Sequence, residues 1–279
     1  MINSKQLFEK VSKHINFFVG VPDSVLKNFT NLIGVSKKKH LIAPNEGSAI
    51  SIAIGYFLKK KKIPCVYMQN SGLGNAINPL VSLADPRVYS IPMILLIGWR
   101  GAPNTNDEPQ HLTKGRITKS LLNLLKIKHC EINSSKDLNK INKLINYSKK
   151  KNTVSAILIK KNQLSETRKK DKKKQFNLLR SEFIKVLLET IKSDDLIIST
   201  TGYTSRELYQ IRKDNRNNLG KDFYMVGGMG HTLSTSIGIA SNTNQRIICL
   251  DGDGSLLMHL GSLNLINYLK PKNLKHIVF

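Results

Sequence analysis

The chain has 279 residues, of which 40% are hydrophobic and 23% charged, a composition typical of a globular protein and not of a disordered one. This length favours two domains over one. Lys and Arg outnumber Asp and Glu by 44 to 19, which alone would suggest a nucleic-acid partner. The excess is mostly lysine in short runs, without an RNA-binding aromatic motif, so we favour a solvated surface that attracts small anions over nucleic-acid binding.

The apolar runs and the cysteines bear on the cellular location of the protein. The longest apolar run, 91–97, is far shorter than the ~20 residues of a membrane span, and the N-terminus has no apolar leader. Cys65, Cys130 and Cys249 are few, odd in number and far apart, so we expect neither a disulfide framework nor a zinc cluster. We therefore expect a cytoplasmic protein without a membrane partner.

The first half of the chain predicts alternating strands and helices. Asp23 follows an apolar segment and a turn, where it can cap a helix. Buried apolar strands that alternate with helices are typical of a parallel sheet covered on both faces. The expected strands are 17–19, 40–43, 64–68, 91–97 and 153–159, and the expected helices are 25–29, 46–58 and one within 72–83.

A polar, charge-dense segment, 161–175, predicts a basic linker, and the alternation restarts after it. We therefore expect an α/β fold of two doubly wound parallel-sheet domains, 1–160 and 176–279. Because the chain ends inside an apolar strand, we expect the second domain to be incomplete. Its expected helices are 176–191, 205–211, 231–240 and 255–269, and its expected strands are 195–200, 223–226, 246–250 and 276–279.

The sharpest motif is Asp251-Gly252-Asp253-Gly254-Ser255, which follows an apolar strand and precedes a helix. Ligands of parallel sheets bind at this edge, where helix amides suit phosphate and a carboxylate suits Mg²⁺. The motif therefore predicts a clamp for a metal and a diphosphate. A plain turn capped by Asp and Ser is the alternative reading.

The same motif resembles the Gly-Asp-Gly motif of the thiamine diphosphate enzymes. The resemblance implies that Asp253 binds Mg²⁺ and that Gly252, Gly254 and Ser255 contact the diphosphate of the cofactor. An Asn normally closes this motif, and here it would fall just beyond Phe279. The resemblance thus also implies that the C-terminal part of the diphosphate domain is missing from the chain.

Glu46 stands between an expected strand and an apolar helix, in Ala43-Pro44-Asn45-Glu46-Gly47. This segment is similar to the one that carries the glutamate of the pyrimidine-binding domain in the same enzymes. The resemblance implies that Glu46 hydrogen-bonds the aminopyrimidine and assists its proton transfer. Taken alone, Glu46 is better explained as an acid favoured at a helix N-terminus, and the diphosphate motif in the same chain reverses this preference.

Three further segments, 18–24, 69–75 and 107–111, resemble the phosphonopyruvate decarboxylase family, and sulfopyruvate decarboxylases more distantly. The resemblance implies a pyrimidine-binding domain followed by a diphosphate-binding domain, with thiamine diphosphate and Mg²⁺ as cofactors. It further implies conversion of 3-phosphonopyruvate to phosphonoacetaldehyde and CO₂ in 2-aminoethylphosphonate biosynthesis. The sites would lie between subunits of a homodimer or homotetramer.

Four cofactor contacts are carried over by position. Thr201 and Gly202 follow the first expected strand of the second domain, and they resemble the loop that contacts the diphosphate and aminopyrimidine. Gly228 and Met229 resemble the segment whose apolar side chain wedges the cofactor into its bent form. An ordinary core methionine is the alternative for Met229.

Asp23 and His111 are the candidate proton relays toward the substrate, since both are expected on loops. Their alternatives are a helix cap for Asp23 and a plain loop histidine for His111. Arg100, Lys114 and Arg116 are candidate partners for the phosphonate of an anionic 2-oxo acid. Sulfopyruvate decarboxylation, another 2-oxo acid decarboxylation, and an inactive remnant or a subunit completed by a second chain remain open.

Overall fold

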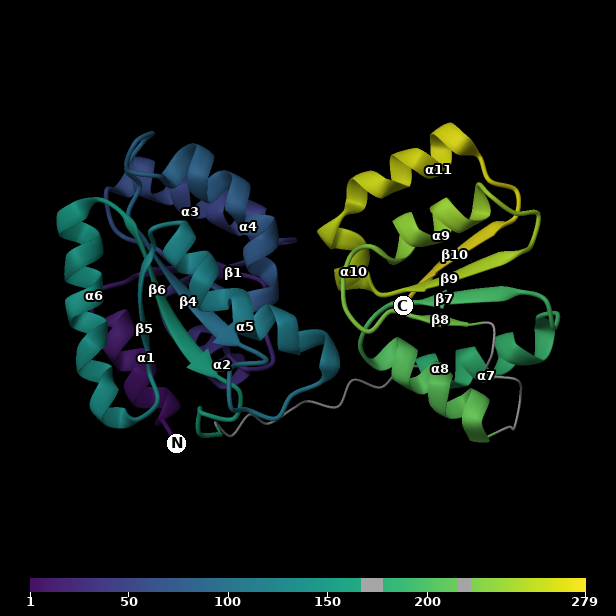
Figure 1. The fold of residues 1–279 in the computed structure, drawn as a ribbon, viewed down its shortest axis with the longest axis horizontal. Helices are drawn as coiled ribbons and strands as arrows, with labels where there is room; N and C mark the ends of the chain where they lie inside the picture. Colours follow the sequence, from purple (N-terminus) through teal and green to yellow (C-terminus); the bar gives the residue numbers. More distant parts are fainter. Residues whose placement is uncertain (167–177, 215–221) are drawn as a thin grey trace. The chain divides into compact units, whose positions relative to one another are not determined.

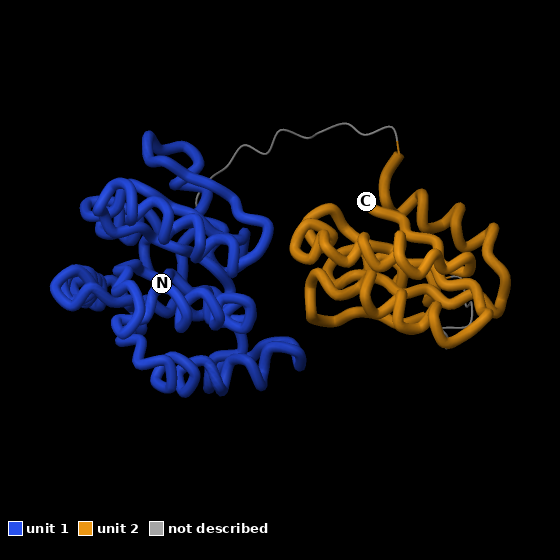
Figure 2. The backbone as a smooth tube through the Cα atoms, turned by 90° about the horizontal axis from the view of Figure 1, so that it is seen from above, with its two compact units in different colours: residues 1–171 blue, residues 172–279 orange. Residues whose placement is uncertain are grey.

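The computed structural model describes residues 1–166, 178–214 and 222–279. It divides the chain into two compact units, 1–171 and 172–279 (Figure 2). The expected linker, 161–175, lies at this division, and most of it falls outside the described residues.

The first unit is built on a six-stranded sheet in the order β2-β1-β3-β4-β6-β5, with every pair of neighbours parallel. Its central strands are apolar runs, because both of their faces are buried. The strands are β1 (Phe17–Gly20), β2 (Lys39–Ile42), β3 (Cys65–Gln69), β4 (Met93–Trp99), β5 (Lys128–Glu131) and β6 (Val154–Lys160).

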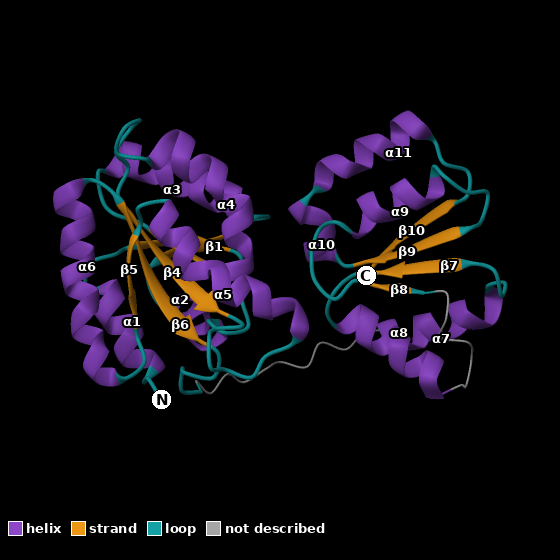
Figure 3. Ribbon diagram, in the orientation of Figure 1, coloured by secondary structure: helices purple, strands orange, loops and turns teal. Residues whose placement is uncertain are grey.

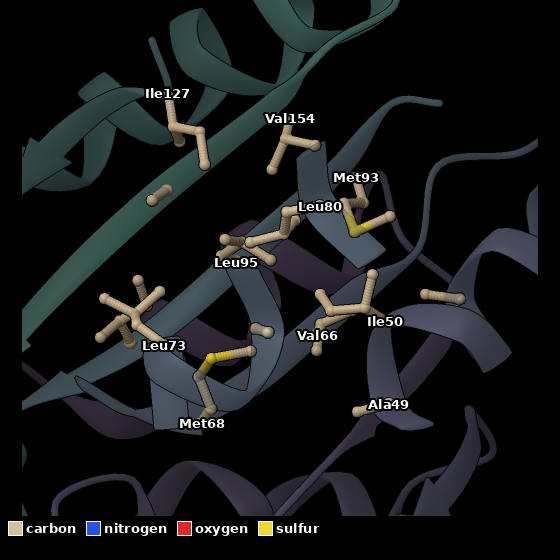
Figure 4. Packing of buried hydrophobic residues seen from close by; sticks show 14 of the residues in the cluster. Ala49, Ile50, Val66, Met68, Leu73, Leu80, Met93, Leu95, Ile127 and Val154 are labelled. Carbon is tan, nitrogen blue, oxygen red and sulfur yellow. The ribbon is translucent and has the colours of Figure 1, made fainter. Parts of the chain in front are cut away.

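Helices cover both faces of this sheet (Figure 1). Side chains alternate along β4, so Met93 and Leu95 pack under α3, α4 and α5, whereas Ile94 and Leu96 face α1, α2 and α6. Figure 4 shows the first of these layers around Met93 and Leu95. The helices are α1 (Ser4–Ser12), α2 (Lys27–Val35), α3 (Glu46–Lys60), α4 (Leu73–Pro79), α5 (Pro109–Leu124) and α6 (Leu138–Lys151).

The second unit has a four-stranded parallel sheet in the order β10-β9-β7-β8. Helices α7 and α8 pack on one face and α9, α10 and α11 on the other (Figure 3). The elements are α7 (Arg180–Thr190), β7 (Leu196–Ser199), α8 (Tyr203–Asp214), β8 (Phe223–Tyr224), α9 (Thr232–Ala240), β9 (Ile247–Asp251), α10 (Asp253–Met258), α11 (Leu263–Leu269) and β10 (Leu274–Val278).

Two local predictions are wrong. The single helix expected over 255–269 is broken at His259, whose φ of −134° and ψ of 49° are not helical, and a short 3-10 turn then leads into α11. His259 stacks on His231 with ring centroids 4.4 Å apart, and this contact accompanies the break. The helix expected over 25–29 begins only at Lys27, so Asp23 caps the turn before α2, where its Oδ2 accepts the amide of Leu26.

In the described ranges, no helix combines the length and apolarity that crossing a bilayer requires. The three cysteines are free, and Cys65 and Cys249 are buried in β3 and β9.

Candidate functional site

The site residues of the first unit follow the carboxyl ends of neighbouring parallel strands. Asp23, Glu46 and Arg100 come after β1, β2 and β4, and Gln69 is the last residue of β3. The strand order reverses around β1, because β2 lies on one side of it and β3 on the other. Such a reversal opens a crevice at the carboxyl edge of the sheet, where ligands of α/β folds bind.

Glu46 is the first residue of α3, and it is only 4% exposed. The helix begins here because the Asn45 side chain accepts the amide of Ser48 at 2.8 Å. Asn75 Nδ2 donates to Glu46 Oε2 at 2.9 Å. On the other side, a Cβ at Gly72 would lie 2.3 Å from Glu46 Oε1, so the carboxyl group occupies space that only glycine leaves free.

Asp23 is buried as well, and it accepts two hydrogen bonds. Its Oδ1 takes a bond from Gln69 Nε2 at 3.0 Å, and its Oδ2 takes one from the amide of Leu26 at 3.1 Å. Burial raises the pKa of Asp23, although these hydrogen bonds and Arg100 act in the opposite direction. A carboxyl group with a raised pKa is suited to hold and pass on a proton.

A cavity of about 590 Å³ opens beside Asp23. Lys27, His40 and Tyr67 contribute polar groups to its wall, and His40 Nε2 lies 2.8 Å from the hydroxyl of Tyr67. The cavity therefore combines a buried acid with a cation, which suits a small anionic acid.

The guanidinium group of Arg100 is paired with two carboxylates and does not point into solvent. Its Nε donates to Asp107 Oδ2 at 2.8 Å, and its Nη2 contacts both Asp107 and Glu108. The Arg100 and Asp107 side chains are largely buried, at 11% and 0% exposed. Of the three candidate phosphonate partners, Arg100 is therefore held by internal ion pairs, whereas Lys114 and Arg116 lie along α5.

His111 is in the first turn of α5 and not on a loop, which corrects the expectation. Its Nε2 lies 3.7 Å from Glu108 Oε2, and its Nδ1 is buried without a hydrogen-bond partner within the described ranges. Burial lowers the pKa of His111, and the positive charge of Arg100 adds to the effect. The imidazole is therefore held in its neutral form near pH 7.

In the second unit, three segments meet at the carboxyl edge of the sheet. Thr200 Oγ1 donates to Ser255 Oγ at 3.0 Å, and the amide of Gly230 donates to the same oxygen at 3.1 Å. Thr201 and Gly202 connect Thr200 to α8, and Gly202, just before the helix, has a φ of +100°. Ser255 thus ties the loop after β7, the 227–231 segment and the turn after β9 together.

Met229 reaches across this edge to the Gly-Asp-Gly turn. It is 44% exposed, and a Cβ added at Gly254 would lie 3.3 Å from its Cε. Gly228 has a φ of +66°, a conformation that favours glycine. Met229 is therefore an exposed side chain next to the turn and not a core methionine.

The acids of the turn differ in their surroundings. Burial would raise the pKa of Asp251, but hydrogen bonds with His276, Ser255 and the amide of Gly252 outweigh it and lower this pKa. Asp253 is exposed, and its Oδ1 accepts the amide of Gly254 at 2.6 Å. An exposed carboxylate beside two glycines, at the start of α10, suits a hydrated Mg²⁺ and the diphosphate bound to it.

Sequence reasoning assigned no role to Asn75, Gln69 or Asp107, although each contacts a predicted site residue. Asn75 and Gln69 bond to Glu46 and Asp23, and Asp107 holds Arg100. All three lie in the segments 69–75 and 107–111 that carry the family resemblance. The family resemblance therefore pointed to these segments, but only the structure shows which site residue each of the three contacts.

Residues 4–122 match the model of the thiamine pyrophosphate enzyme N-terminal TPP binding domain, and residues 200–279 that of the C-terminal TPP binding domain. A phosphonopyruvate decarboxylase of Streptomyces viridochromogenes is 34% identical over 281 residues, covering 93% of this chain and 68% of the relative. A sulfopyruvate decarboxylase of Methanosarcina acetivorans is 26% identical, covering 98% and 74%. The sulfopyruvate decarboxylase subunit beta of Methanocaldococcus jannaschii is 43% identical over 94 residues, covering 34% and 47%.

Proposed function

Because the chain belongs to the phosphonopyruvate decarboxylase family of thiamine pyrophosphate enzymes, which makes it a carboxy-lyase for 2-oxo acids, we propose that it converts 3-phosphonopyruvate to phosphonoacetaldehyde and CO₂. The observation that carries this proposal is 34% identity to a phosphonopyruvate decarboxylase across 93% of the chain. We further propose that this reaction serves 2-aminoethylphosphonate biosynthesis. A cytoplasmic location fits the three free cysteines.

The residues present fit thiamine diphosphate and Mg²⁺. When bound, the cofactor supplies an electron sink for the electron pair left behind as CO₂ departs. Glu46 would hold a proton at the aminopyrimidine, with its buried carboxyl group packed against Gly72 and bonded to Asn75. Asp253 would hold Mg²⁺, and Gly254 and Ser255, at the start of α10, would contact the diphosphate.

The remaining cofactor contacts lie at the same edge of the second sheet. Thr201 and Gly202 would contact the diphosphate and the aminopyrimidine, and Gly228 would leave room for the cofactor. Met229 would press on the cofactor from its exposed position beside Gly254. Such a contact from Met229 would help to hold the reacting groups in position.

On the substrate side, Asp23 and His111 would move protons. Asp23 has a raised pKa and can donate, whereas the neutral imidazole of His111 can accept. The cavity beside Asp23 would take the substrate, with Lys27 facing its phosphonate. The net charge of +25 favours arrival of such an anion.

Sulfopyruvate decarboxylation is the second candidate, because a sulfopyruvate decarboxylase aligns with 98% of the chain. The assay that separates the two supplies thiamine diphosphate and Mg²⁺ with 3-phosphonopyruvate, sulfopyruvate or pyruvate, and it measures CO₂ and aldehyde. We expect the highest kcat/KM for 3-phosphonopyruvate. A preference for sulfopyruvate would select the second candidate, and no turnover of any of these acids would overturn the proposal.

We also propose that the protein assembles as a homodimer or homotetramer. One relative is the beta subunit of a sulfopyruvate decarboxylase, which supports an assembly of several chains. Light scattering of the purified protein should give a multiple of 31.4 kDa. A monomer that turns over substrate would contradict the assembly, and activity that needs a second polypeptide would replace it with a two-chain enzyme.

A further inference from the structure

We propose that Asn75 is a positioning residue that fixes the carboxyl group of Glu46, an inference that rests on the proposed function of Glu46. Asn75 Nδ2 donates to Glu46 Oε2 at 2.9 Å. An amide nitrogen only donates, so Oε2 must accept in this pair. A proton that Glu46 holds or passes on is therefore favoured on Oε1, the oxygen that Asn75 leaves without this bond.

The packing of two helices places Asn75 where it can act. Asn75 lies in α4, which packs against α3, and a Cβ at Gly47 would be 3.0 Å from the carbonyl oxygen of Asn75. The backbone of α4 can come this close to the start of α3 because position 47 is glycine. The Asn75 amide then bonds to the carboxyl group of Glu46, which also packs against Gly72.

The contact is not part of the core. Asn75 is itself exposed, so truncating its side chain removes no buried apolar surface. The partner oxygen belongs to a carboxyl group that is only 4% exposed, and such a group has few other partners. Truncating Asn75 therefore creates no apolar cavity, and its effect falls on the carboxyl group of Glu46.

The test is a double-mutant cycle on cofactor binding. Calorimetry would measure the affinity for thiamine diphosphate with Mg²⁺ in the wild-type protein, Asn75→Ala, Glu46→Gln and the double variant. We expect Asn75→Ala to weaken binding roughly 10- to 100-fold, the range for a hydrogen bond to a charged group, and to have almost no effect in the Glu46→Gln background. Equal effects of Asn75→Ala in both backgrounds would overturn the proposal.

Kinetics supply a second readout. In Asn75→Ala, kcat should fall while KM for the oxo acid changes little, and Asn75→Asp should be slower still because it places a second carboxyl group beside Glu46. Asn78→Ala is the matched control, since Asn78 lies in the same helix and bonds to the hydroxyl of Ser82 at 2.9 Å.

The outcomes separate Asn75 from the wider proposal. An unchanged kcat in Asn75→Ala, or a loss that Asn78→Ala matches together with a lower Tm, would contradict a positioning role. If the wild-type protein binds thiamine diphosphate but decarboxylates none of the acids, the proposed function fails, while the binding cycle still decides the role of Asn75.

Discussion

Asp23 lies directly over Gly98 at the end of β4, so closely that a Cβ at position 98 would be 1.9 Å from Asp23 Oδ2. The buried carboxyl group therefore depends on a bare position in a neighbouring strand. The contribution of Gly98 to the site is the space that its missing side chain leaves for Asp23.

Substituting Gly98 by Ala should displace Asp23 from Gln69 and from the amide of Leu26. We expect kcat to fall at least about tenfold, because a misplaced proton donor loses general acid–base assistance. The matched control is Gly55→Ala in α3, where a Cβ would meet nothing within 4 Å, and which should keep or raise Tm. Equal activity in the two variants would show that the position of Asp23 is immaterial.

Replacing Asp23 by Asn should raise stability at neutral pH while it lowers activity. Burial raises the pKa of Asp23, so folding favours the protonated form, and that stabilisation is lost as pH rises through the native pKa. At pH 7 the variant avoids the cost of a buried charge, and its Tm should exceed that of the wild type. The difference should shrink toward zero as pH falls to the ordinary value of 3.8. Thermal melts across pH that show a constant difference would refute this account.

Arg100 should prove structural, in contrast to the sequence-based hypothesis of a phosphonate contact. Arg100→Gln would leave the fully buried Asp107 carboxylate with Lys161 as its remaining cationic partner at 3.1 Å. We expect a loss of up to about 3 kcal/mol in the free energy of unfolding, measured by urea titration. Arg116→Gln, at an exposed position in α5, should leave stability unchanged. If Arg100→Gln instead keeps its stability and only raises KM, Arg100 binds the substrate.

Asp253→Asn should remove the Mg²⁺ dependence of cofactor binding. The carboxylate is exposed at the start of α10, so neutralising it should leave Tm nearly unchanged. Calorimetry with and without Mg²⁺ should give a large difference for the wild type and little for this variant. Asp194→Asn, at an exposed position before β7, is the control. A wild-type Mg²⁺ response in Asp253→Asn would place the metal elsewhere.

The apolar strands were predictable because two buried faces leave a continuous hydrophobic run, as in β4. The edge strand β5 reads Lys-His-Cys-Glu and carries no such signal. The stripe of α6, which includes Ile141 and Ile145, does follow a helical period in the sequence, although no helix was predicted there. Strand β5 lies at the edge of the first sheet, where one side is unpaired and the apolar pattern is weak.

Within the site, sequence placed Glu46 and the Gly-Asp-Gly turn correctly at the ends of strands. It could not place Asn75, because the bond to Glu46 depends on how α4 packs against α3. Nor could it foresee that Arg100 is paired with Asp107, since a sequence lists cations without their partners. Contacts between elements far apart in the chain are what the structure adds.

Glu46→Gln tests the account most directly. The change keeps the shape and the capped helix start, and it removes the carboxyl group that we propose exchanges a proton with the cofactor. With thiamine diphosphate, Mg²⁺ and 3-phosphonopyruvate, we expect CO₂ release to fall roughly 10²- to 10⁴-fold with an unchanged Tm, whereas Glu9→Gln on the exposed side of α1 stays active. CO₂ release by Glu46→Gln at the wild-type rate would contradict the account.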